Sequence, residues 1–203
     1  MSNEKSIGRE SLLSDVKPSK AIVKLAVPAT IALLAKAVYN IVDTAYIGFL
    51  DSEAALAAVG VTLPLLLIFV SIENIFASGA AVLAGRQLGA GDKNGASVTI
   101  STIVAASTLI GGLLCVGGII FMEPLLRTFG ASETVMPLAK DYAFWMFIAA
   151  IANLPAQSLN CAARAESSVK ISTIAVITGA ALNVVLDPIF MFEWGLNMGV
   201  EGA

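Results

Sequence analysis

The stretch that decides the fold is Ile177–Phe192, ITGAALNVVLDPIFMF, an apolar run interrupted by an amide, a carboxylate and a proline. Because residues four apart stack on one face of a helix, Asn183 and Asp187 are expected to lie together. A carboxylate in a membrane-spanning helix is costly unless it faces protein, water or an ion, so it is a candidate functional residue. Pro188 has no backbone N–H and leaves the carbonyl of Val184 without its helical donor. A bent helix with a free carbonyl beside an Asn/Asp pair predicts a cation or proton site.

The composition places this helix in a membrane. Of 203 residues, 57% are hydrophobic and 13% are charged, with a mean hydropathy of +0.85, whereas soluble domains are about a quarter charged. The sequence therefore predicts an all-α, polytopic transmembrane helical bundle. A net charge of −3 without a basic patch argues against a nucleic-acid partner. There is no histidine, nucleophile–base pair or metal-ligand cluster in the sequence, so we expect neither an enzyme nor a bound cofactor.

Five apolar segments are long enough to cross a bilayer. Residues 1–20 are polar, lack the apolar core of a signal peptide and are expected to form a cytoplasmic tail. Residues 21–203 are expected to form one transmembrane lobe that stops at the start of a sixth helix. The glycine-rich segment RQLGAGDKNGA, residues 86–96, is expected to be a tight turn between two spans. The five spans are predicted at about 21–50, 54–85, 97–122, 142–163 and 171–192.

The positive charges orient the chain in the membrane. Lysine and arginine gather in cytoplasmic loops of membrane proteins. One side of the predicted bundle carries most of them, which places the N-terminus in the cytoplasm of a cell whose plasma or inner membrane holds the protein. This side has Lys5, Arg9, Lys17, Lys20, Arg86, Lys93, Arg164 and Lys170, and the opposite side has Arg127 and Lys140.

The same topology gives Asp187 a partner. The first and fifth spans both run outward, with Asp43 seven residues before Leu50 and Asp187 six residues before Glu193. Both acids are therefore expected in the outer half of the membrane at a similar depth, where they share one site if the two helices face each other. Two nearby buried carboxylates repel each other, so one is expected to hold a proton, or both to hold Na⁺. The structural alternatives for Asp43 are a hydrogen-bonded packing role or an acid that snorkels toward the outer water. The structural alternative for Asp187 is a helix-terminal acid at a proline break.

Four further residues stand out in the first two spans. Counting depth from both faces places Lys36 level with Glu73, and intramembrane charges usually pair, so an ion pair is predicted. The alternative is that Glu73 faces a cleft and attracts cationic substrates. Asn40, three residues before Asp43, is expected either to orient that acid or to bond another helix. Pro28 is expected to bend the first helix.

Three motifs carry a resemblance to a known family, multidrug and toxic compound extrusion (MATE). They are LAVPATIALLAKAVYNIVDTAYIG at 25–48, RQLGAGDKNGA at 86–96 and RAESSVKISTIAVITGAALNVVLDPIFMF at 164–192. The resemblance extends over nearly everything after residue 20, and the chain resembles the N-terminal lobe of such a transporter.

The resemblance implies two six-helix lobes around a central cleft, with the C-terminal lobe absent from these residues. It implies export of cationic or amphipathic drugs in exchange for Na⁺ or H⁺ by alternating access. It also implies that Asp43, Asn183 and Asp187 bind the coupling cation, with a hydroxyl from the sixth helix that this chain does not reach. Two alternatives stay open: a lipid or oligosaccharide flippase of the same superfamily, and a truncated membrane module that transports nothing.

Overall fold

The computed structural model describes residues 18–49, 53–166, 168–192, 195–196 and 198. The predicted tail lies almost entirely outside these residues, as does most of the segment in which a sixth helix was expected to begin. The described part is helical, and five of its helices are long and apolar enough to cross a membrane, which confirms the predicted bundle. The helices are α2 (Pro18–Gly48), α3 (Glu53–Gly89), α4 (Lys93–Ile120), α5 (Met122–Thr128), α6 (Met136–Ala165) and α7 (Val169–Met191).

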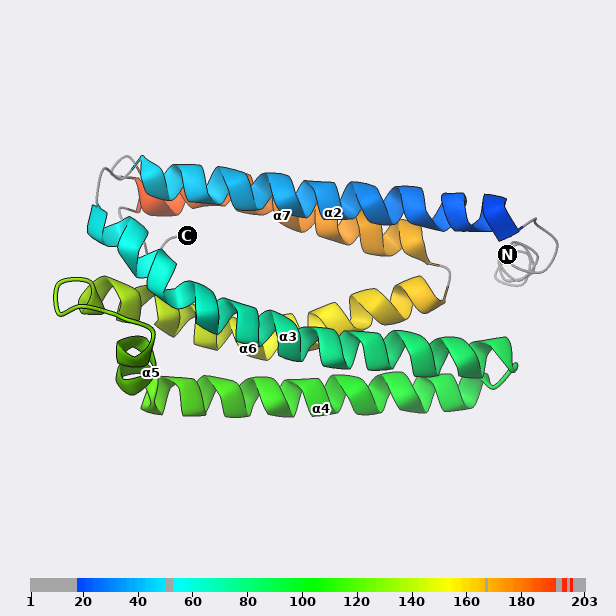
Figure 1. The fold of residues 1–203 in the computed structure, drawn as a ribbon. Coiled ribbons are helices and arrows are strands. Elements are labelled where there is room, and N and C mark those ends of the chain that lie inside the picture. Colours follow the sequence, from blue (N-terminus) through cyan, green and yellow to red (C-terminus); the bar gives the residue numbers. More distant parts are fainter. Residues whose placement is uncertain (1–17, 50–52, 167, 193–194, 197, 199–203) are drawn as a thin grey trace.

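The helices form two groups (Figure 1). One group is the pair α2 and α7, which run side by side in the same direction. The other group contains α3, α4 and α6, with α3 and α6 running opposite to α4, and the short α5 joins α4 to α6. Contacts within each group are extensive, whereas those of α2 with α3 and of α7 with α6 are sparse. The chain is therefore a three-helix support with a two-helix layer attached.

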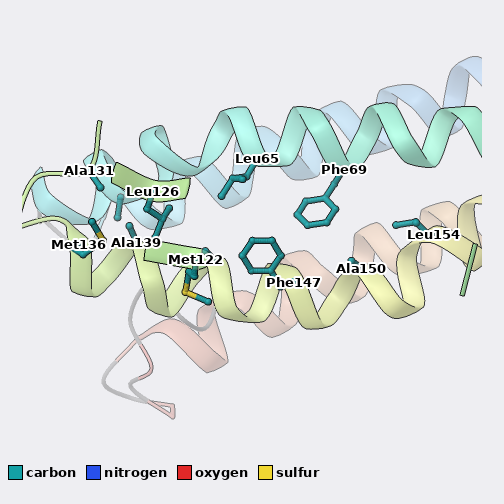
Figure 2. Close-up of a cluster of buried hydrophobic side chains, with 12 residues drawn as sticks. Leu65, Phe69, Met122, Leu126, Ala131, Met136, Ala139, Phe147, Ala150 and Leu154 are labelled. Atoms are coloured by element: carbon teal, nitrogen blue, oxygen red, sulfur yellow. The ribbon is translucent and has the colours of Figure 1, made fainter. Parts of the chain in front are cut away.

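The apolar core lies in the support, between α3, α5 and α6 (Figure 2). Leu126 of α5 and Leu154 of α6 are fully buried. The rings of Phe69 in α3 and Phe147 in α6 meet edge to face, with their centroids 5.5 Å apart. Aromatic pairs with this geometry contribute beyond the area they bury, so the contact fixes α3 against α6.

Glycine allows α4 to approach α6 closely. A Cβ added to Gly111 would lie 2.8 Å from the carbonyl oxygen of Ala150, and one added to Gly118 would run into the ring of Phe147. Small residues at such contacts are the usual means of close packing between membrane helices. Gly112 and Gly117 have nothing within 4 Å of the same position, so the adjacent glycines differ in role.

Of two connections between spans, one differs from its prediction and the other matches it. The fourth span begins at Met136, six residues before the predicted start, because Pro137 lies in its first turn, where proline removes no helical hydrogen bond. The glycine-rich segment is the expected tight turn. Its Gly91 has φ 79°, and Asp92 Oδ1 accepts a hydrogen bond from the backbone N–H of Gly95 at 2.8 Å, which begins α4.

Candidate cation site

Asn183 and Asp187 lie on one face of α7, as their spacing predicted. Asn183 Nδ2 donates a hydrogen bond to Asp187 Oδ1 at 3.0 Å. Asp187 is 3% exposed, although aspartate is almost never fully buried unless it is paired. The amide therefore satisfies one carboxylate oxygen and leaves the other free.

Asp43 reaches this site from α2. It is partly buried, and it is near enough to Asp187 for the two negative charges to influence each other. The two acids come from parallel, adjacent helices, which is the arrangement that the depth argument predicted. The structure thus brings together Asp43, Asn183 and Asp187, while their role in binding a cation stays a prediction.

Three oxygens of this site lack hydrogen-bond donors. In the described part of the chain, four buried side-chain oxygens have no hydrogen-bond partner, and three of them are Asp43 Oδ1, Asn183 Oδ1 and Asp187 Oδ2. The fourth, Gln87 Oε1, belongs to the end of α3. Buried polar atoms are nearly always paired, because each unpaired one forfeits its hydration. Three unpaired acceptors in one place are suited to a proton or to a hard cation, which takes oxygen ligands.

At each of the two interior prolines of the α2–α7 pair, Pro28 and Pro188, a hydroxyl from the opposite helix bonds a backbone carbonyl. Tyr46 of α2 donates to the carbonyl of Val184 at 3.4 Å, and this is the carbonyl that Pro188 leaves without a helical donor. Thr173 of α7 donates to the carbonyl of Pro28 in α2 at 3.3 Å. These two bonds join α2 to α7 at both ends of the pair.

Lys36 and Glu73 interact without a direct contact. The positive charge of Lys36 acts on Glu73, and both side chains are half-buried. Among the described residues, however, the ion pairs within 4.0 Å are those that join Glu123 to Arg127 and Lys140, and Arg127 to Glu133. The predicted Lys36–Glu73 interaction is therefore long-range attraction in this structure rather than a contact ion pair.

Asn40 is exposed rather than packed against the acid. The hydrogen bond at this residue involves its backbone carbonyl, which accepts from Thr44 Oγ1 at 2.8 Å. A role for its amide in orienting Asp43 stays a prediction.

Sequence reasoning missed three tyrosines. Tyr39 of α2 is influenced by the charges of Asp43, Glu73 and Asp187, and Tyr142 of α6 by the charge of Asp43. Tyr46 is the donor to Val184. Helical spacing carried the signal for two of them, since Tyr39 and Tyr46 lie four residues before and three residues after Asp43.

The match to a family model covers residues 28–189 and is described as MatE. The multidrug export protein MepA of Staphylococcus aureus strain MSSA476 is 28% identical over 179 residues, which are 88% of this chain and 40% of that protein. A protein of Shewanella oneidensis described as an FAD transporter is 30% identical over 201 residues, 96% of this chain and 43% of the relative. The chain thus spans about two fifths of the curated relatives it matches.

Solved structures agree with the fold. A crystal structure described as a MATE in the straight conformation superposes with a TM-score of 0.87 at 29% identity, covering 95% of this chain and 42% of that one. The resemblance noted in the motifs is therefore confirmed over most of the sequence, and the five apolar helices form a multi-pass membrane protein. The chain belongs to the MatE family.

Proposed function

We propose that this chain is the N-terminal lobe of an ion-coupled antiporter that exports cationic or amphipathic drugs. The observation that carries the proposal is the group of unpaired oxygens on Asp43, Asn183 and Asp187. A protein of this size ordinarily pairs nearly all its buried acceptors. Acceptors left open at the contact between two helices form a site in which Na⁺ or H⁺ would supply the missing partner. The similarity to a multidrug export protein supports drugs as the substrate class.

The coupling mechanism follows from the repulsion between Asp43 and Asp187. With no cation bound, two carboxylate charges oppose each other across the α2–α7 contact. Binding Na⁺ or H⁺ removes that repulsion and draws the helices together, so the cation stabilises one conformation over another. The sparse contacts of this pair with the other helices allow such a shift, and Pro28, which lies inside α2, is the point at which α2 would bend. The cation moves inward down its gradient and the substrate is released outward.

The topology proposed for this mechanism has the N-terminus in the cytoplasm of a bacterial-type plasma membrane. The α3–α4 and α6–α7 connections lie at the same end of the bundle as the start of α2 (Figure 1), and lysine and arginine gather at that end. Single cysteines placed in the α3–α4 turn and in the α5–α6 connection test this. Only the second should react with an impermeant maleimide added outside intact cells.

The test of coupling uses vesicles that contain the complete protein to which these residues belong. Drug efflux is measured under a Na⁺ gradient alone and under a pH gradient alone. Asp43→Asn and Asp187→Asn should each abolish efflux, whereas the control Asp141→Asn, which neutralises an exposed carboxylate of α6, should not. Gradient-driven efflux retained in both site variants would contradict the proposal.

An anionic substrate is the second candidate. The FAD transporter similarity points to it, and Lys36, half-buried in α2, would supply the positive charge that such a substrate or a flippase head group needs. FAD that competes with a cationic drug, and loses its effect in Lys36→Gln, would favour this candidate. A module that transports nothing predicts no efflux under either gradient, from the complete protein as well as from this lobe.

A further inference from the structure

The carbonyl of Val184 lies beside the candidate cation site and has lost its helical donor. In a regular helix the backbone N–H four residues later would bond this oxygen, but that residue is Pro188. A buried or membrane-embedded carbonyl without a donor is costly. Val184 follows Asn183 directly and lies one turn before Asp187. A donor that bonds the Val184 carbonyl therefore also restrains the turn of α7 that contains Asn183 and Asp187.

Tyr46 supplies the replacement donor from the other helix. Its hydroxyl donates to the Val184 carbonyl at 3.4 Å, and its ring meets Phe192 edge to face, with centroids 6.1 Å apart and planes at 86°. The ring contact fixes the direction of the side chain, and the hydroxyl extends across the helix contact. Tyr46 is on α2, three residues after Asp43, so the same helix turn carries the acid and the donor.

We propose that Tyr46 is a positioning residue of the cation site, and the proposal rests on the function proposed above. Its hydroxyl connects the turn of α7 that bears Asn183 and Asp187 to the turn of α2 that bears Asp43. In this role it holds the unpaired oxygens of these residues on neighbouring turns of the two helices. Without this bond the turn ahead of Pro188 has one fewer restraint. Cation binding must then order this turn, and the loss of conformational entropy weakens the binding.

The hydroxyl and the ring make separable contributions. Tyr46→Phe removes the donor and keeps the edge-to-face contact, whereas Phe192→Leu removes the contact and keeps the donor. A structural role in packing predicts the larger effect from Phe192→Leu. A positioning role predicts that Tyr46→Phe alone weakens cation binding while the protein stays folded.

A double-mutant cycle with Pro188→Ala isolates the bond. Alanine at 188 restores the backbone N–H, so Val184 regains its helical donor and the tyrosine hydroxyl becomes redundant. Tyr46→Phe should therefore weaken cation binding in the wild-type background and have little effect in the Pro188→Ala background. Neighbouring residues that share a partner show this kind of non-additivity.

Thermal unfolding of the purified complete protein is measured at increasing NaCl and fixed pH, with choline chloride as the control salt. A pH titration in sodium-free buffer is the second arm. A neutral hydrogen bond is worth about 0.5–1.5 kcal/mol, so Tyr46→Phe should raise the Na⁺ midpoint about two- to tenfold, or shift the midpoint of the pH titration if the coupling ion is H⁺. Thr173→Val, which removes the comparable bond to Pro28, is the matched control and should leave the midpoint within twofold.

Three outcomes overturn the proposal. The first is a Tyr46→Phe midpoint equal to that of the wild type. The second is an equal shift in both backgrounds of the cycle. The third is a shift in Thr173→Val as large as in Tyr46→Phe. If Pro188→Ala does not fold, the comparison of Tyr46→Phe with Phe192→Leu decides. A wild-type protein that responds to neither Na⁺ nor pH instead contradicts the proposed function, and the positioning role with it.

Discussion

The α2–α7 pair and the α3–α4–α6 group are built on different principles. In the most apolar stretch of α2 only 6% of the residues are buried, and 11% in α7, against 28% in both α3 and α6. The three-helix group is held by apolar side chains and glycine contacts. The pair is held in addition by two hydroxyl-to-carbonyl bonds and contains the site with unpaired oxygens. The comparison indicates that the apolar core and the candidate cation site lie in different parts of the lobe.

The largest stability effect is expected in the apolar group. Phe147 is 2% exposed and packs edge to face on Phe69. Phe147→Ala should lower the free energy of unfolding by about 3–5 kcal/mol, because the cavity forfeits dispersion contacts that lipid does not replace. Phe144→Ala, at a ring that is 38% exposed, is the control and should cost much less. Thermal unfolding in detergent measures both, and equal losses would show that the core is not where the structure places it.

Asp187→Asn should abolish cation binding without lowering the stability of the cation-free protein. In sodium-free buffer it should leave the protein at least as stable as the wild type, because it removes a buried charge that faces Asp43 and carries an unpaired oxygen. If Na⁺ is the coupling ion, NaCl at a hundred times its dissociation constant should stabilise the wild type by about 2.7 kcal/mol and the variant not at all. Stabilisation of the variant by Na⁺ to the same extent would remove this carboxylate from the site.

The glycine contact between α4 and α6 offers a test within two adjacent residues. Gly111→Ala should destabilise the lobe by about 1–3 kcal/mol, because the new methyl meets the backbone of Ala150, which has no freedom to move aside. Gly112→Ala meets nothing within 4 Å and should gain up to about 1 kcal/mol of helix propensity. Equal melting temperatures for the two variants would contradict the close approach.

The sequence predicted most of the fold because each membrane span is a local feature of the sequence, a long apolar run between polar turns. It also paired Asp43 with Asp187, because a span fixes the depth of each residue it contains. It did not predict that Tyr46 would bond Val184, because the rotation of one helix about its axis depends on packing with its neighbour. For the same reason the sequence placed Lys36 and Glu73 at one depth but did not predict that they would interact without a contact ion pair.

The smallest effect is expected at Glu123, outside both groups of spans. Its carboxylate accepts from Lys140 Nζ at 2.6 Å and from Arg127 at 3.0 Å, and these bonds lower its pKa below the ordinary 4.5. A carboxyl whose pKa is lower in the folded protein stabilises it above its unfolded pKa, and this contribution is lost as the pH falls through the folded value. Because the pairs are solvent-exposed, the contribution is small.

Glu123→Gln should therefore lower the melting temperature slightly at pH 7, by less than Gly111→Ala does. The difference from the wild type should shrink as the pH falls below 4.5, where the unfolded chain takes up protons first. Asp141→Asn, which neutralises an exposed acid of α6, serves as the control at each pH. If the melting temperature of Glu123→Gln stays equally far below that of the wild type in acid, packing of α5 rather than charge stabilises this end of the lobe. The apolar core would then extend to the end of the bundle.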